Sequence, residues 1–260
     1  MRFVAAIAAA VALAGAGVAA QAPPTPELGV LAPSNLSKPR PKPPFTITGT
    51  WFIDLGFPGS WRFGPPYPKL TPEAQKHFDA SRKAQAEGKV YRDDIGQCWP
   101  AGVPLIMTRV WSISMVQLPT VVYMISGFMN SLRVINMDGR PHTDPDLLVR
   151  TFNGDSIGHW EDDALVVDTT GFIDHHHWID SGIPASDALH IVERIRLVGP
   201  NGTKMQIEYT LTDPKSWEGE WKVTKQWNRV DARDMEIAEV ECLPDLNSHI
   251  PSTQSKENVR

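Results

Sequence analysis

The sequence has no excess of positive charge. Its 25 lysines and arginines are outnumbered by 30 aspartates and glutamates, so the formal net charge is −5. A protein that binds nucleic acid needs a basic stripe to contact the phosphates. The mild and mixed charge of this chain argues against that class, and it gives no reason to expect binding to anionic membranes.

Long hydrophobic runs are also scarce. Beyond the N-terminus, no segment approaches the roughly 20 apolar residues that a membrane-spanning helix requires. The N-terminus itself carries Arg2, an apolar, alanine-rich run over residues 3–13, and small residues at Val18 and Ala20. This pattern is typical of a cleaved secretory signal, with an uncleaved anchor as the alternative. We therefore expect residues 1–20 to be removed and the mature, soluble protein to be periplasmic or secreted.

Cysteine is limited to two residues, Cys98 and Cys242. Two thiols so far apart in the sequence do not form a zinc-binding motif. An exported protein meets an oxidising compartment, where a disulfide between them is allowed. Two separate buried thiols are the alternative.

Several catalytic motifs are missing. The sequence contains no nucleophile elbow, no phosphate-binding loop and no dinucleotide fingerprint. A cofactor-dependent oxidoreductase is therefore not expected, and we expect no bound cofactor. No repeat of fixed period is visible either, which leaves one domain as the default for a chain of this length.

The composition divides the chain into four parts. After the signal, residues 21–44 are rich in proline, which predicts a flexible or polyproline-like leader. Residues 45–247 form the single expected domain, and residues 248–260 are polar and without period, which indicates a loose tail.

One helix is expected within the domain, over residues 71–87. Thr71 can cap its N-terminus, Pro72 suits the first helical position, and Gly88 ends it. Its interior is mostly polar, so we expect it on the surface.

The rest of the domain consists of short β patterns separated by turns. The short linkers predict antiparallel neighbours. The expected strands cover residues 46–53, 105–110, 112–118, 121–126, 132–137, 158–161, 164–170, 189–198, 204–212, 221–230 and 235–242.

So many strands predict an all-β protein, either a barrel or a sandwich. Gly49-Thr50-Trp51 resembles the Gly-x-Trp start of lipocalin-like barrels, also called calycins. We therefore expect an antiparallel β-barrel with one short surface helix. A β-sandwich whose base is closed by a tryptophan remains the alternative.

The strand over residues 189–198 has a clear inner face. Its odd positions carry Leu189, Ile191, Ile195 and Leu197, and side chains alternate across a strand. Glu193 belongs to the same set and is therefore expected to point into the apolar interior. A lone carboxylate there would be costly, so it requires a polar partner or a raised pKa.

The next two strands have the same alternation and add two polar inward positions, Tyr209 and Lys225. We expect these side chains to be the first candidates for contact with Glu193. The set would form either a polar patch in a ligand cavity or a buried salt bridge that fixes the register.

The most distinctive segment is residues 158–172, with the sequence G-H-W-E-D-D-A-L-V-V-D-T-T-G-F. It resembles a large family of exported bacterial proteins marked by W-E-G-D-T-L-V-V-D-T-T-G-F, and it departs from that pattern at Asp162 and Ala164. The resemblance extends over C-W-P-A-G-V-P, D-G-R-P-H, D-A-L-H-I-V-E-R and E-V-E-C, and so from residue 98 to residue 242. It implies export, a β-rich fold and pairing of the two cysteines. It implies no particular reaction.

Three adjacent histidines, residues 175–177, follow this segment. They could bind a metal if a further ligand approached, and Asp174, Asp180, His142 and His190 are the candidates. We favour the other interpretation, in which no metal is bound and His177 and Trp178 line the mouth of a cavity. A histidine placed there could act as a general acid or base.

Together these observations favour a barrel that holds a small apolar or aromatic molecule, because nine tryptophans and eight methionines suit such a cavity. We expect a cofactor-free isomerase, lyase or cyclase, in which Glu193 with His177 or Asp168 moves a proton while Tyr209 and Lys225 polarise an oxygen. The alternatives are a periplasmic binding protein without chemistry and a structural envelope protein. The expected ligand contacts are Trp178, Trp227, Tyr123, Arg140 and His142.

Overall fold

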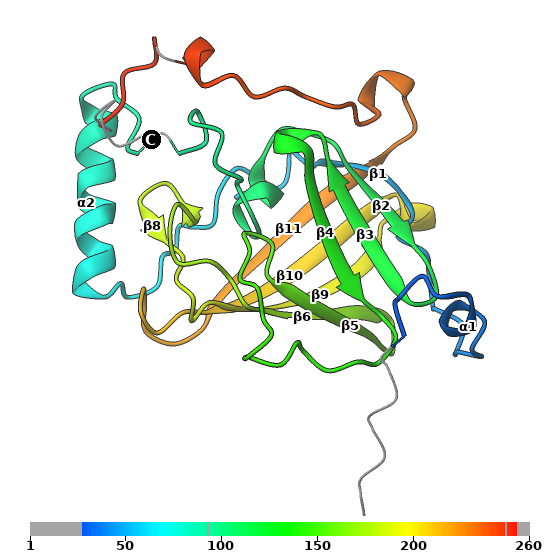
Figure 1. Cartoon of the computed structure of the whole chain (residues 1–260). Coiled ribbons are helices and arrows are strands. Elements are labelled where there is room, and N and C mark those ends of the chain that lie inside the picture. The colour runs from blue at the N-terminus through cyan, green and yellow to red at the C-terminus, as the bar shows by residue number, and fades with distance from the viewer. Residues whose placement is uncertain (1–27, 93, 248, 254–260) are drawn as a thin grey trace, which may run out of the picture.

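Nine strands close into a barrel (Figure 1), in the order β1-β11-β10-β9-β6-β5-β4-β3-β2. The computed structural model describes residues 28–92, 94–247 and 249–253, so the expected signal sequence lies outside it. The barrel confirms the expected fold class over the sandwich. The barrel strands are β1 (Gly49–Ile53), β2 (Ile113–Gln117), β3 (Val121–Ser126), β4 (Ser131–Asn136), β5 (Asp155–Glu161), β6 (Ala164–Thr170), β9 (His190–Val198), β10 (Lys204–Thr212) and β11 (Trp221–Val230).

Neighbouring strands pair antiparallel, as the short linkers predict, except at one seam. There β4 and β5 run parallel and share only two register positions, Ile135 with Ser156 and Asn136 with Ile157. A parallel neighbour needs a long connection, which residues 137–154 supply. The seam is therefore the place where the barrel wall is least continuous.

The barrel interior is filled by alternate residues of each strand. In β9 the buried positions are Ile191, Glu193 and Ile195, which confirms the register expected for this strand. Large aromatic side chains such as Trp51 and Trp227 occupy the space between the walls and are almost fully buried. The interior is thus a packed core, of the kind that small barrels form from their inward side chains.

One end of the barrel is covered by α2 (Pro72–Ala86) and the small hairpin of β7 (Trp178–Asp180) and β8 (Ile183–Pro184). The helix has the expected start, because Thr71 accepts a hydrogen bond from the Ala74 amide at 3.3 Å. It lies on the surface but presents small residues such as Ser81 to the hairpin. A Cβ at Gly182 would stand 2.4 Å from Ser81 Cβ, so this packing requires a glycine. Among the described residues, no helix is long and apolar enough to cross a membrane.

Two expected strands are wrong. Leu105–Thr108 is a short 3-10 helix whose four side chains are all buried, so its apolar run reflects burial on every side rather than one face of a strand. Residues 236–242 belong to no strand and run along the surface after the 3-10 turn Arg233–Met235. The remaining 3-10 turns are Phe128–Asn130, Pro200–Gly202 and Pro244–Asn247.

The two ends of the described chain are more ordered than their composition suggests. In the leader, α1 (Pro33–Leu36) forms one helical turn that begins at Pro33. The tail is held by Val90, whose amide donates to the Pro251 carbonyl at 2.8 Å and whose carbonyl accepts from the Thr253 amide at 3.0 Å. Both segments are held by contacts with distant residues, which local composition does not reveal.

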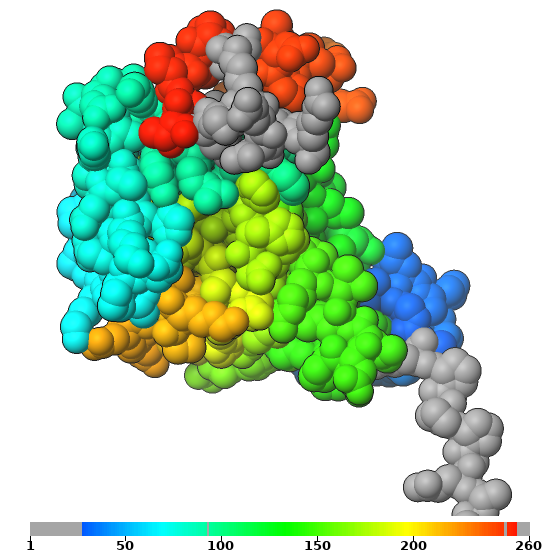
Figure 2. Space-filling view, turned by 60° about the vertical axis from the view of Figure 1, so that its left-hand side comes forward, coloured from blue at the N-terminus to red at the C-terminus, as the bar shows by residue number. Residues whose placement is uncertain are grey.

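The segment after β11 forms a C-terminal strap, residues 231–247 and 249–253, over one side of the molecule (Figures 1 and 2). The expected disulfide is confirmed: Cys98 and Cys242 are bonded, with Cα atoms 5.8 Å apart. Asn130 adds a pair of hydrogen bonds, donating to the Val240 carbonyl at 2.8 Å and accepting from its amide at 3.0 Å. Cys242 therefore lies in this strap and not in a last barrel strand.

Candidate functional site

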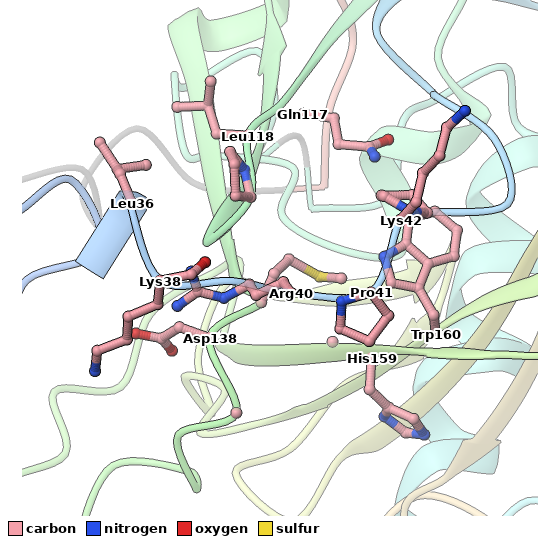
Figure 3. A pocket seen from close by; sticks show the side chains of 15 residues that line it. Leu36, Lys38, Arg40, Pro41, Lys42, Gln117, Leu118, Asp138, His159 and Trp160 are labelled. Atoms are coloured by element: carbon pink, nitrogen blue, oxygen red, sulfur yellow. The ribbon is translucent and has the colours of Figure 1, made fainter. Parts of the chain in front are cut away.

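A groove of approximately 680 Å³ lies between the leader and the barrel end remote from α2 (Figure 3). We call it the mouth groove. It brings together segments that are far apart in the sequence: the leader, the β2–β3 turn, the end of β4 and the end of β5. Its lining residues are Leu36, Lys38, Arg40, Pro41, Lys42, Pro43, Gln117, Leu118, Pro119, Met137, Asp138, Gly139, Gly158, His159 and Trp160.

The apolar part of the mouth groove is built on β5. Trp160 packs edge-on against Phe45, with ring centroids 4.9 Å apart. Gly158, on the same side of the strand, leaves room for a neighbouring side chain, since a Cβ there would stand 2.6 Å from Met137 Sδ. The alternation along β5 thus places the Trp160 indole and Gly158 on one side of the strand, and Met137, which follows β4, packs over the glycine.

The leader is fastened to the barrel by a polar clasp around Asp138. Asn35 donates to Asp138 Oδ2 at 2.9 Å. Arg140 binds the same carboxylate with two nitrogens, at 2.8 and 2.7 Å. The Arg140 hydrogen bond is the main reason that the pKa of Asp138 is held well below its usual range, so the carboxylate stays ionised. Arg140 was expected to contact a ligand, but it binds Asp138 in this clasp and does not line the groove.

The polar groups of the mouth groove are mostly basic. Arg40 is directed back to the leader, where it donates to the Asn35 carbonyl and side-chain oxygen, both at 2.7 Å. Lys38 and Lys42 are exposed, and neither forms an ion pair within the described part of the chain. Gln117 accepts from the Ile47 amide at 3.0 Å.

Glu193 points into the barrel as expected, but its partner is Arg133. Arg133 Nη1 donates to Glu193 Oε1 at 3.2 Å and Nη2 donates to Oε2. The guanidinium also donates to the hydroxyls of Ser156, at 3.1 Å, and Thr169, at 2.8 Å. Both side chains are buried and paired with each other, so Glu193 has the structural arrangement of an ion pair and does not line the mouth groove.

Tyr209 and Lys225 do not bind Glu193. Tyr209 stands opposite Glu193 in the register, but its hydroxyl has no hydrogen-bond partner among the described residues. Burial, reinforced by the Glu193 charge, raises the pKa of Tyr209. Lys225 donates to the carbonyls of Gly59 and Arg62, both at 2.8 Å. Its ammonium therefore holds the turn that follows β1 instead of facing a ligand.

His177 and Trp178 are buried at the α2 end and do not form a mouth. His177 donates to the Val103 carbonyl at 2.8 Å, and burial lowers the pKa of this imidazole to about 4. Trp178 donates its indole N–H to Asp94 at 2.6 Å. The segment after β6 folds over the end of the barrel, where Trp178 and Ile179 join the barrel core and close the expected opening.

The three adjacent histidines separate in space. His175 is exposed beside Asp174, whereas His176 stacks on Trp99 at 4.0 Å and contacts Asp94 at 2.8 Å. With His177 buried among other groups, the run does not converge. Within residues 28–92, 94–247 and 249–253, no three His, Cys, Asp or Glu side chains are arranged to hold a metal ion.

Asp168 and His142 meet on the outer face of the barrel. His142 lies between two carboxylates, with Nδ1 3.0 Å from Asp155 and Nε2 3.1 Å from Asp168. His190 approaches the same Asp168 oxygen at 2.9 Å. Asp168 and His142 are thus on the opposite side of the wall from Glu193, and neither lines the mouth groove.

The remaining expected ligand contacts are also elsewhere. Trp227 is buried in the core. Tyr123 pairs in register with Val116 and Val134, which are exposed on the outer face, so it points away from the interior. The interpretation of Tyr123 as a cavity residue is wrong because β3 is apolar on both faces and its sequence does not reveal its register.

Comparisons with known proteins do not place the chain in a family. No family model matches the chain, and no curated protein matches it. Among solved structures, the wild-type fluorescent protein UnaG is 12% identical, with a TM-score of 0.35, over 71% of this chain and 97% of UnaG. A point mutant of UnaG is 12% identical, with a TM-score of 0.32, over 72% of this chain and 97% of that one.

Proposed function

We propose that this protein binds a small, largely apolar or aromatic molecule in the mouth groove. The observation that carries the proposal is the groove itself. Its volume, approximately 680 Å³, falls within the range of about 300–1,000 Å³ that is usual for small-molecule sites. Its lining combines apolar side chains such as Trp160, Met137 and Leu118 with a few polar groups at the edge, which is the composition of such sites.

Binding without chemistry is favoured over catalysis. The five expected acid–base residues are Glu193, His177, Asp168, Tyr209 and Lys225, and none of them lines the mouth groove. A general acid or base must come within hydrogen-bond reach of the proton it moves. Since the candidates are dispersed through the core and on the outer wall, we propose a binding protein, and not the isomerase, lyase or cyclase that the sequence suggested.

The binding proposal is tested with N-phenyl-1-naphthylamine, a neutral probe whose fluorescence rises in apolar surroundings. Leu118→Trp should obstruct part of the groove with a larger side chain and weaken binding at least tenfold. Val116→Trp is the matched control, because Val116 lies two residues earlier, on β2, and is exposed outside the groove. Equal binding by the wild type and Leu118→Trp, or no binding by the wild type, would refute the proposal.

We also propose that binding takes place outside the cytoplasm. The disulfide between Cys98 and Cys242 supports this, because such bonds persist in oxidising compartments. Mass spectrometry of the periplasmic fraction should find a mature N-terminus near Gln21. Recovery of the chain with Met1 intact from the cytoplasm would contradict the proposal.

A further inference from the structure

The mouth groove carries a charge of the opposite sign to the rest of the protein. Three basic residues, Lys38, Arg40 and Lys42, and one acidic residue, Asp138, line it. The whole chain has a formal net charge of −5. A local field that reverses the sign of the net charge raises the local concentration of ions of one sign, and here those ions are anions.

The single acidic residue of the groove does not cancel this field. Asp138 is already occupied by Arg140, which binds it through two nitrogens, and by the Asn35 amide. Its negative charge is therefore matched by Arg140, a residue outside the groove lining. The charges of Lys38 and Lys42 are not matched in this way, since neither amine has an ion pair within the described residues.

Gln117 adds a neutral hydrogen-bond donor, the NH₂ group of its side chain, to the lining of the groove. Its side-chain oxygen is taken by the Ile47 amide at 3.0 Å, which fixes the orientation of the carboxamide. The NH₂ group of the same side chain makes no hydrogen bond with another described residue. Since this group only donates, the groove contains a further feature that favours an acceptor such as a carboxylate or sulfonate oxygen.

The apolar surfaces beside these groups are flat. Trp160 supplies an indole ring, and Pro41, Pro43 and Pro119 add rigid rings to the lining. Figure 3 shows Pro41, Lys42 and Trp160 at one end of the groove and Lys38 with Asp138 at the other. A planar hydrocarbon body placed between the two ends would have an ammonium available near either edge.

We propose that the mouth groove selects an anion with a flat apolar body, held through Lys38, Lys42 and the Gln117 amide. This inference rests on the proposed binding function and adds to it the charge of the ligand. It makes the two lysines and Gln117 specificity-determining residues, while Trp160 and Leu118 provide affinity for the apolar body regardless of charge.

The test uses two probes with the same aromatic skeleton. N-Phenyl-1-naphthylamine is neutral, whereas 8-anilinonaphthalene-1-sulfonate adds one negative charge. The variant Lys38→Gln with Lys42→Gln should weaken binding of the sulfonate about tenfold, because it removes both exposed cations that would attract the negative charge. Binding of the neutral probe should stay within twofold. Lys69→Gln with Lys222→Gln is the control, because these exposed lysines lie outside the groove and should leave both affinities unchanged.

Gln117→Glu provides an independent variant. It keeps an oxygen for the Ile47 amide but replaces the NH₂ donor with a second carboxylate oxygen. We expect weaker binding of the sulfonate probe, unchanged binding of the neutral probe and the same melting temperature as the wild type. The sulfonate affinity of the wild type should also fall as salt rises, because exposed charges are screened.

The outcomes separate this inference from the function on which it rests. If Leu118→Trp leaves the affinity for both probes unchanged, the proposed function fails. If Leu118→Trp weakens binding of the neutral probe but the lysine variant binds the sulfonate within twofold of the wild type, only the anion selectivity fails. If the lysine variant weakens binding of both probes equally, the inference is also overturned, since the lysines would then affect the shape of the groove and would not distinguish ligands by charge.

Discussion

The buried pair of Arg133 and Glu193 leads to a sharp prediction about stability. The two residues are 2% and 1% exposed, so water solvates neither charge. Glu193→Gln keeps the shape of the side chain and removes its charge, which leaves the guanidinium without a counter-ion. Removing one partner of a buried pair costs about 3–5 kcal/mol. That is a large share of a total stability of roughly 5–15 kcal/mol.

The assay is guanidinium-induced unfolding of the oxidised protein, followed by circular dichroism. For a chain of this size the loss corresponds to a melting temperature lowered by about 6–20 °C. The double variant Arg133→Met with Glu193→Leu removes both charges. Its loss in free energy of unfolding should be smaller than the sum of the losses of Arg133→Met and Glu193→Leu made singly, because no charge is left unpaired. Ser156 and Thr169 keep a partner in that variant, since their hydroxyls lie 3.0 Å apart.

Glu208→Gln is the control for this prediction. Glu208 is exposed on the neighbouring strand and pairs with Arg196 at 3.4 Å, an arrangement worth about 0–1 kcal/mol. If Glu193→Gln changes the free energy of unfolding no more than this control, the argument from buried charge is refuted.

Three further predictions concern pH, the disulfide and the leader. Burial lowers the pKa of His177 to about 4, below the unfolded value of about 6.5. The free energy of unfolding should therefore fall by roughly 3 kcal/mol as the pH drops from about 6.5 to about 4. Urea titrations at each pH should show this pH dependence, and His177→Gln should remove it. Reduction of the disulfide, whose cysteines are 144 residues apart, should lower the free energy of unfolding by up to about 5 kcal/mol, and an unchanged urea midpoint would contradict this. Asn35→Ala breaks the hydrogen bond to Asp138 and should weaken binding of N-phenyl-1-naphthylamine several-fold, whereas Ser34→Ala on the same helical turn should not.

The register of β9 could be predicted from the sequence because its two faces differ. Leucine and isoleucine alternate there with histidine and arginine, so the position of Glu193 followed directly. In β4 the same reasoning would fail. Leu132 and Val134 are the exposed side chains and Arg133 is the buried one, the reverse of what hydrophobicity predicts. The partner of Glu193 was therefore missed, because its identity depends on a charge pair formed across the barrel.

The mouth groove was missed for a different reason. Its lining comes from four segments, and one of them is a proline-rich stretch whose composition suggests a flexible leader. One contact that holds this leader joins Asn35 to Asp138, which are 103 residues apart. No local pattern indicates such a pairing. The D-G-R-P-H segment did mark Arg140 as notable, but it gave no indication that this residue acts through Asp138.

The distribution of charge in the barrel explains why binding is favoured over catalysis. A catalytic acid or base needs a proton or lone pair that a substrate can reach, yet Glu193 and Lys225 have theirs taken by Arg133 and by backbone carbonyls. A binding site needs the opposite, polar groups whose partners are missing until a ligand arrives. Lys38 and Lys42 meet that condition at the mouth groove. Because the satisfied charges lie in the core and the unsatisfied ones lie at the edge of the barrel, substitutions that alter recognition can be made without breaking the pairs that stabilise the fold.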